Sequence, residues 1–193
     1  MPCALLYWCK LYAQLINTAL CVDIETTHFN GPISVMGVYQ PKDGPVESLS
    51  FVRERDLNSE NLSQVFAGCR LLITYNGVSF DIPRIRREFP DTLPKSIPVL
   101  DLYRLAWRLG FNTNLKVLEN TFGIPRLDEE QSQRFFAVRL WKRYTAFKDE
   151  EALEKLVAYN RQDTINLYPL ANHLIGMAMQ NEGISEILVG VDQ

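Results

Sequence analysis

Apolar and polar positions alternate with period two in the first part of the chain, which predicts β-strands separated by short turns. The predicted strands cover residues 20–27, 33–39 and 46–52, with turns rich in Asn, Gly and Pro between them. Because the turns are short, neighbouring strands should pair as an antiparallel meander. The preceding residues 3–18 are apolar but interrupted by Lys10 and Gln14, which favours a short helix beside the sheet over a signal peptide.

After residue 52 the pattern changes to helices that alternate with short apolar strands. The predicted strands are 70–75 and 97–101, and the predicted helices are 58–69, 81–89 and 102–109. A helix between successive strands favours parallel pairing, because the chain must cross back over the sheet.

Only helical patterns follow residue 114. The predicted helices cover 115–122, 132–147 and 149–180, and we expect Pro169 to kink or divide the last one. The complete pattern predicts an α/β fold. Its mixed five-stranded sheet, an antiparallel meander plus parallel strands, is flanked by helices, and the C-terminal third is helical.

The first predicted strand carries two acids on one face. Asp23 and Glu25 alternate with apolar residues and follow an apolar start on both faces of the strand. At about 5 Å and an effective dielectric constant of about 20, two such carboxylates repel each other by roughly 3 kcal/mol. A bound divalent cation offsets this repulsion most directly, whereas a strand end that runs into solvent leaves both acids hydrated.

Two later acids occupy positions where they could join the first pair. Asp81 opens a helix directly after a strand and turn, so it either caps the helix or faces a ligand at the strand end. Asp163 lies one helical turn after Tyr159 on an inward side, where an acid needs a metal or a basic partner such as Arg161. Asp101 ends another strand, and helix capping is the interpretation that we favour there.

Composition limits the remaining possibilities. The net charge is −3, yet residues 84–143 hold 12 Lys and Arg against 7 Asp and Glu, so the middle third can present a basic surface. The four cysteines lack C-x-x-C spacing and only two histidines exist, which argues against zinc or a disulfide framework. No apolar run is long enough for a membrane span, and we expect a cytoplasmic protein with no membrane partner.

Three motifs contain the four acids. Residues 22–27 read VDIETT, residues 76–81 fit N-x-x-x-F-D, and residues 159–163 fit Y-x-x-x-D. In this order they resemble the motifs of the DEDD superfamily of 3′–5′ exonucleases, which have the ribonuclease H-like fold. The tyrosine before the last acid, with Ala158 beside it and no histidine nearby, resembles the DEDDy subgroup. The YprB-like ribonuclease H-like domain is the subfamily we would name.

The resemblance spans about residues 19–170. We therefore expect residues 1–193 to form a single exonuclease domain, with an N-terminal helix at 3–18 and a C-terminal tail at 183–193.

The resemblance implies that Asp23, Glu25, Asp81 and Asp163 bind two divalent cations, Mg²⁺ or Mn²⁺. Oxygen ligands alone suit such hard cations, and two of them can stabilise both the attacking and the leaving oxygen of a phosphoryl displacement. Asp23 is expected to bridge the ions, Glu25 and Asp163 to complete the site that activates water, and Asp81 to hold the second ion. Tyr159 is expected to orient the water. These four acids and Tyr159 are the predicted catalytic residues.

The resemblance also implies the substrate and its contacts. Single-stranded nucleic acid, DNA somewhat favoured over RNA, would lose nucleoside 5′-monophosphates from its 3′ end. The backbone around Ile24, Thr26 and Thr27 is expected to approach the terminal nucleotide, with Asn76 and Phe80 on either side of it.

Three other functions stay open on the sequence. The same fold also supports structure-specific endonucleases and non-catalytic modules that bind nucleic acid or protein. A proofreading subunit that acts only with a polymerase is also compatible with the motifs. Neither a polymerase or repair partner nor an oligomeric state follows from the sequence.

Overall fold

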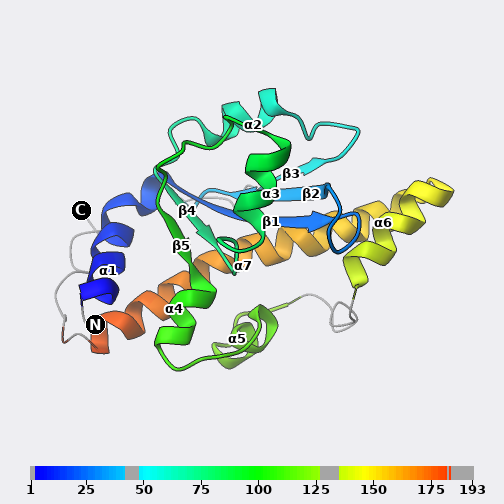
Figure 1. The fold of residues 1–193 in the computed structure, drawn as a ribbon. Helices are drawn as coiled ribbons and strands as arrows, with labels where there is room; N and C mark the ends of the chain where they lie inside the picture. Colours follow the sequence, from blue (N-terminus) through cyan, green and yellow to red (C-terminus); the bar gives the residue numbers. More distant parts are fainter. Residues whose placement is uncertain (1–2, 42–47, 127–134, 182, 184–193) are drawn as a thin grey trace.

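A five-stranded mixed sheet lies at the centre of the structure, a computed structural model that describes residues 3–41, 48–126, 135–181 and 183 (Figure 1). The strand order is β3-β2-β1-β4-β5. β1 pairs antiparallel with β2 and parallel with β4, β2 pairs antiparallel with β3, and β4 pairs parallel with β5. The strands are β1 Ala19–Thr26, β2 Ile33–Tyr39, β3 Ser48–Val52, β4 Leu71–Thr74 and β5 Val99–Asp101. The predicted fold class, a meander joined to parallel strands, is confirmed.

β1 is the central strand, and its alternating side chains enter two different cores. Leu20, Val22 and Ile24 are buried against helices α2 (Ser59–Phe66) and α3 (Asp81–Glu88). Cys21 is buried on the opposite face, in the core that the other helices share. Asp23 and Glu25 continue this second face, as the period-two pattern predicts.

The second face is covered by α7 (Glu150–Asn181), a helix of 32 residues that lies across the sheet (Figure 1). Four shorter helices pack around it or beside it: α1 (Cys3–Leu15), α4 (Leu102–Arg108), α5 (Leu115–Thr121) and α6 (Phe136–Phe147). The hydroxyl of Tyr12 in α1 donates to the Asn172 side chain of α7 at 2.6 Å. None of the helices in the described ranges is long and apolar enough to span a membrane.

α7 packs closely against the sheet at Gly37 of β2. A Cβ atom at this position would lie 2.1 Å from Oγ1 of Thr164 and 2.6 Å from Oδ1 of Asn160. Both contacts are far inside van der Waals distance, so the side chains of α7 can sit here only because residue 37 is glycine.

The structure differs from the predicted elements in a few places. Pro169 does not divide α7, because apolar neighbours such as Leu167 and Leu170 are fully buried and hold the helix on both sides of it. The N-terminal α-helix ends at Leu15 and continues as a short 3-10 helix, Ile16–Thr18. Some predictions fall on residues that the structure does not describe. These are most of the turn between the second and third predicted strands, the first residues of the strand 46–52 and of the helix 132–147, and the tail from residue 184.

Candidate active site

The site lies where β1 extends beyond its parallel neighbour. β4 pairs with β1 only from Ala19 to Cys21, so the second half of β1 has no strand on that side. The backbone N–H of Ile24 there donates to Oδ1 of Asp81 at 3.0 Å. Asp81 therefore replaces the missing strand as an acceptor, and its carboxylate is held beside the two acids of β1.

The C-terminal half of β1 and the interior of α7 bring three carboxylates together. One oxygen from each of Asp23, Glu25 and Asp163 lies within 4.8 Å of the others. Asp163 is buried, and Asp23 and Glu25 are partly buried. Asp81 is outside this group of three, yet its hydrogen bond to the residue between Asp23 and Glu25 attaches it to the same place. The structure thus gathers all four predicted acids in one region.

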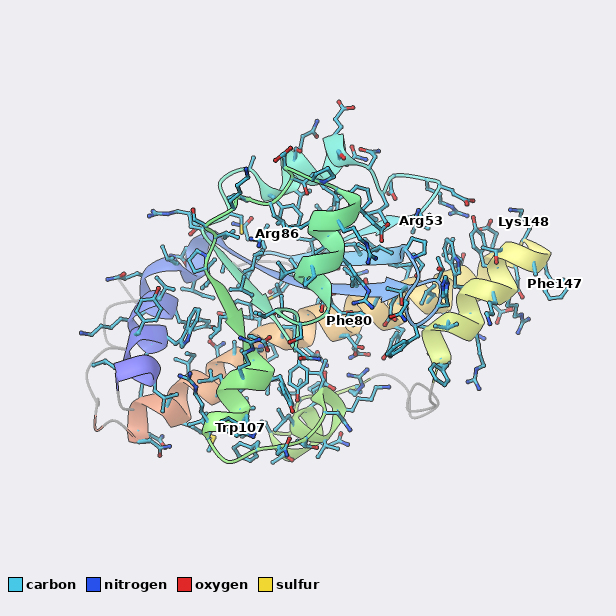
Figure 2. The ribbon with its side chains drawn as sticks, in the orientation of Figure 1. Arg53, Phe80, Arg86, Trp107, Phe147 and Lys148 are labelled. Atoms are coloured by element: carbon cyan, nitrogen blue, oxygen red, sulfur yellow. The ribbon has the colours of Figure 1, made fainter. Side chains whose placement is uncertain are left out.

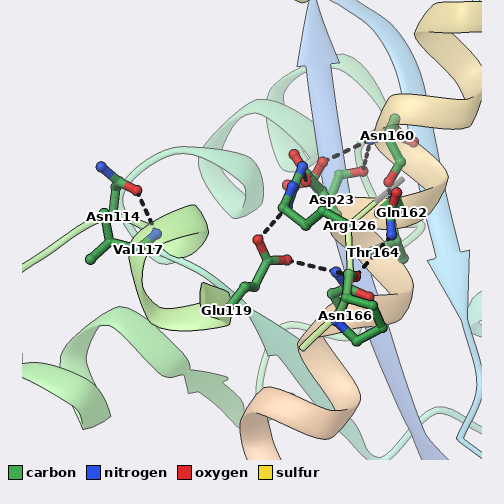
Figure 3. Close-up of polar contacts among 11 residues, drawn as sticks. Asp23, Asn114, Val117, Glu119, Arg126, Asn160, Gln162, Thr164 and Asn166 are labelled. Carbon is green, nitrogen blue, oxygen red and sulfur yellow. Dashed lines mark hydrogen bonds and ion pairs between the residues drawn. The ribbon is translucent and has the colours of Figure 1, made fainter. Parts of the chain in front are cut away.

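Two side chains of α7 orient these carboxylates. Nδ2 of Asn160 donates to Oδ2 of Asp23 at 2.8 Å and to its backbone oxygen at 3.2 Å (Figure 3). Tyr159 lies one helical turn before Asp163, and its hydroxyl lowers the pKa of the Asp163 carboxyl. Asn160 was not assigned a role from the sequence, although its place beside Tyr159 in the third motif was the available signal.

A basic side chain that the sequence analysis did not single out contacts the last acid. Nη2 of Arg126 donates to Oδ1 of Asp163 at 2.5 Å, and its Nη1 donates to Glu119 of α5. Oε1 of Glu119 accepts from Nδ2 of Asn166 at 2.9 Å (Figure 3). The arginine partner that the sequence left open for Asp163 is therefore Arg126 and not Arg161.

Burial and mutual repulsion make the acids hard to ionise in the absence of a cation. Burial, followed by the charges of the neighbouring carboxylates, raises the pKa of Asp23 and of Glu25. Burial also raises the pKa of Asp81 to about 7, although the Ile24 N–H acts in the opposite direction. For Asp163, burial raises the pKa and Arg126 partly offsets the effect. Such a set of oxygen donors, short of positive charge, fits hard divalent cations.

The acids line a cavity of about 710 Å³. Ile24, Asn76 and Phe80 line it too, as does the segment 112–116 before and within α5. Phe80 lies at the N-terminal end of α3 (Figure 2), and the Arg84 guanidinium sits 3.6 Å from its ring centre. Three of the five predicted substrate residues therefore line the same cavity as the acids.

The other two predicted substrate residues lie to one side. Thr26 is buried and lines a neighbouring cavity of about 200 Å³, together with Phe29 and Phe135. Thr27 belongs to the turn after β1, where its hydroxyl lies 3.0 Å from Nδ1 of His28.

The turn after β4 is held by Asp101. Its carboxylate accepts the backbone N–H groups of Tyr103 and Arg104, which confirms it as the N-cap of α4. It also accepts from the N–H groups of Asn76 and Val78, across the cavity rim. Asn76 has a positive φ of 58°, a conformation that asparagine tolerates well, so its backbone shapes the turn while its side chain stays exposed.

A model of the RNase H superfamily matches residues 20–175, which is most of the sequence and includes all the acids above. The chain belongs to the RNase H superfamily. Among solved structures, the family B DNA polymerase from the hyperthermophilic archaeon Pyrobaculum calidifontis has a similar fold, with a TM-score of 0.57 and 16% identity. The match covers 88% of this chain and 26% of the polymerase, so this RNase H superfamily chain spans about a quarter of that protein. No curated protein matches the sequence.

Membership of the RNase H superfamily and the acid cluster together support a nuclease, an enzyme that acts on nucleic acid, and RNase H-like nucleases usually use divalent metal ions. The described sheet, its helices and the acid cluster all agree with an RNase H-like nuclease.

Proposed function

We propose that this chain is a metal-dependent 3′–5′ exonuclease of the DEDDy type that hydrolyses single-stranded nucleic acid, DNA somewhat more readily than RNA. The observation that carries the proposal is the meeting of Asp23, Glu25 and Asp163 within 4.8 Å, with Tyr159 lining the same cavity. These residues come from two motifs that lie far apart in the sequence, and the cluster lines a cavity of about 710 Å³.

The four acids suit two cations, Mg²⁺ or Mn²⁺. They offer only oxygen atoms, and burial, with mutual repulsion at Asp23 and Glu25, raises their pKa values, so a bound cation would stabilise the ionised carboxylates. Asp23, Glu25 and Asp163 would hold one ion, and Asp81 would share the second with Asp23. When bound, the ions would activate water and stabilise negative charge on the oxygens of the cleaved phosphodiester.

The other residues of the site would orient the attacking water and the carboxylates, or bind the terminal base. Burial raises the pKa of Tyr159, so its hydroxyl keeps its proton and can hold the attacking water by donating or accepting a hydrogen bond. Asn160 fixes the Asp23 carboxylate. Phe80 offers a ring on which the terminal base can stack, and Asn76 lies on the same cavity wall.

The test uses 5′-labelled single-stranded DNA and RNA of matched sequence with Mn²⁺. The wild-type protein should give a ladder that shortens from the 3′ end, and Asp163→Asn should abolish it. Glu154→Gln removes an exposed acid from the same helix and should leave the ladder unchanged.

The products discriminate between the rival functions. Cuts inside the strand would identify an endonuclease. Intact oligonucleotides with several metals, but a measurable affinity for the strand, would identify a non-catalytic binding module.

A further inference from the structure

A closed ring of polar contacts lies behind Asp163. The Arg126 guanidinium bridges two carboxylates, those of Asp163 in α7 and Glu119 in α5. Glu119 is bonded in turn to Asn166, which lies three residues after Asp163 on α7 (Figure 3). The ring therefore begins and ends on the same helix.

The backbone next to Arg126 is fixed on α7 as well. The carbonyl oxygen of Pro125 accepts from Nε2 of Gln162 at 3.1 Å and from Nδ2 of Asn166 at 3.2 Å. These two donors flank Asp163 in the sequence. The guanidinium is thus held by its own backbone and by Glu119, and it is not merely a flexible surface side chain that meets Asp163 by chance.

The side chains of this ring are buried, so each polar group needs a well-placed partner. The Glu119 side chain has no exposed surface, and the side chains of Arg126 and Asp163 are 10% and 8% exposed. A planar guanidinium can donate to two acceptors in fixed directions, which the single ammonium group of lysine cannot reproduce. The arrangement therefore depends on the shape of arginine in addition to its charge.

We propose that Arg126 is a positioning residue that fixes the Asp163 carboxylate in the orientation in which it joins Asp23 and Glu25 as a cation ligand. Glu119 anchors Arg126 and balances its charge. The inference rests on the proposed function, because it assumes that these carboxylates bind divalent cations. It adds two residues, Arg126 and Glu119, that support the site from behind without touching the reacting atoms.

The test compares Arg126→Lys and Glu119→Gln with the wild-type protein, all freed of metal by EDTA and dialysis. Calorimetric titration with Mn²⁺ gives the metal affinity, and oligonucleotide cleavage gives kcat and KM. Arg55→Lys is the matched control, because Arg55 also pairs with a carboxylate of α7, that of Glu150, far from the cluster. Thermal melting of the metal-free proteins shows whether each variant folds.

Outer residues that orient metal ligands typically contribute 10–100-fold to metal affinity or activity. We expect Arg126→Lys to weaken Mn²⁺ binding roughly 10-fold or more and to lower kcat, with KM within about twofold of wild type. Excess Mn²⁺ should restore part of kcat. Glu119→Gln should act in the same direction, and Arg55→Lys should change neither quantity.

Two results would overturn the inference. Unchanged Mn²⁺ affinity and kcat in a folded Arg126→Lys protein would leave Arg126 a purely structural residue. Tighter Mn²⁺ binding would show that Arg126 competes with the cation for Asp163. Calorimetry also separates this inference from the proposed function: a protein that binds Mn²⁺ in an Arg126-dependent way but cleaves no strand refutes only the exonuclease, whereas wild-type protein that binds no Mn²⁺ refutes both.

Discussion

In the metal-free protein, the free energy of unfolding should decrease as the pH rises. The cause is clearest at Asp81, a residue that is only 4% exposed and whose pKa is raised from an ordinary 3.8 to about 7. At about 1.4 kcal/mol for each pKa unit, this difference corresponds to about 4 kcal/mol of folding free energy. Asp23 and Glu25, whose pKa values are also raised, act in the same direction.

The stability falls with rising pH because the folded chain binds more protons than the unfolded chain. Between about pH 4 and pH 7 the folded chain keeps a proton on Asp81 that the unfolded chain has already released. Folding therefore takes up protons in this range, and the free energy of unfolding is highest below pH 4 and declines until the pH passes about 7. From pH 5 to pH 7, Asp81 alone should contribute a loss of about 2–3 kcal/mol.

The assay is urea unfolding in EDTA at pH 5, 6, 7 and 8, followed by circular dichroism. Wild-type protein should lose stability steadily across this range, and Asp81→Asn should lose about 2–3 kcal/mol less. Glu154→Gln should follow the wild-type curve, and Mg²⁺ should raise stability most at high pH. A flat or rising wild-type curve, or identical curves for wild type and Asp81→Asn, would refute the reasoning.

Three further substitutions test other parts of the structure. Gly37→Ala should cost about 1–3 kcal/mol in urea unfolding, because its Cβ overlaps α7. By contrast, Gly176→Ala, where a Cβ meets nothing within 4 Å, should be neutral or stabilising, and equal losses would contradict the close approach. Asp101→Ala removes the acceptor of four backbone N–H groups and should lower the free energy of unfolding by roughly 2 kcal/mol or more. Asp101→Asn should lower it by less than Asp101→Ala does. An unchanged melting curve for Asp101→Ala would argue against this cap. Tyr159→Phe should lower kcat roughly 10–100-fold while unfolding changes by less than about 1 kcal/mol, and an unchanged kcat would remove Tyr159 from the proposed site.

Local patterns were sufficient to predict the sheet. The bounds of β2 are those predicted, and β1 differs from its prediction by one residue at each end, because period-two alternation and flanking turns are properties of neighbouring residues. The same alternation predicts that Asp23 and Glu25 share a face. The approach of Asp163 followed from the order of the motifs, and the structure brings all of these carboxylates together.

The supporting residues could not be predicted in the same way. Arg126 follows a helix stop and looks like an ordinary loop residue, and Glu119 looks like an exposed acid of a short helix. Their roles depend on how α5 and the following turn pack against α7, over sequence distances that no local period records. Gly37 is a comparable case, since only the position of α7 explains why a strand interior lacks a side chain.

The strand order and the long last helix have a consequence for synthesis on the ribosome. β1 is synthesised before α7, the helix that covers one of its faces and ends at Asn181. At about 5–20 residues per second, that helix emerges roughly 10–30 s after the strand. Until then α7 does not cover the apolar face beside Cys21, and Asp163 is missing from the cluster of acids. All five strands are therefore made before α7, and that helix is the segment that both closes the core on this face and completes the cluster of acids.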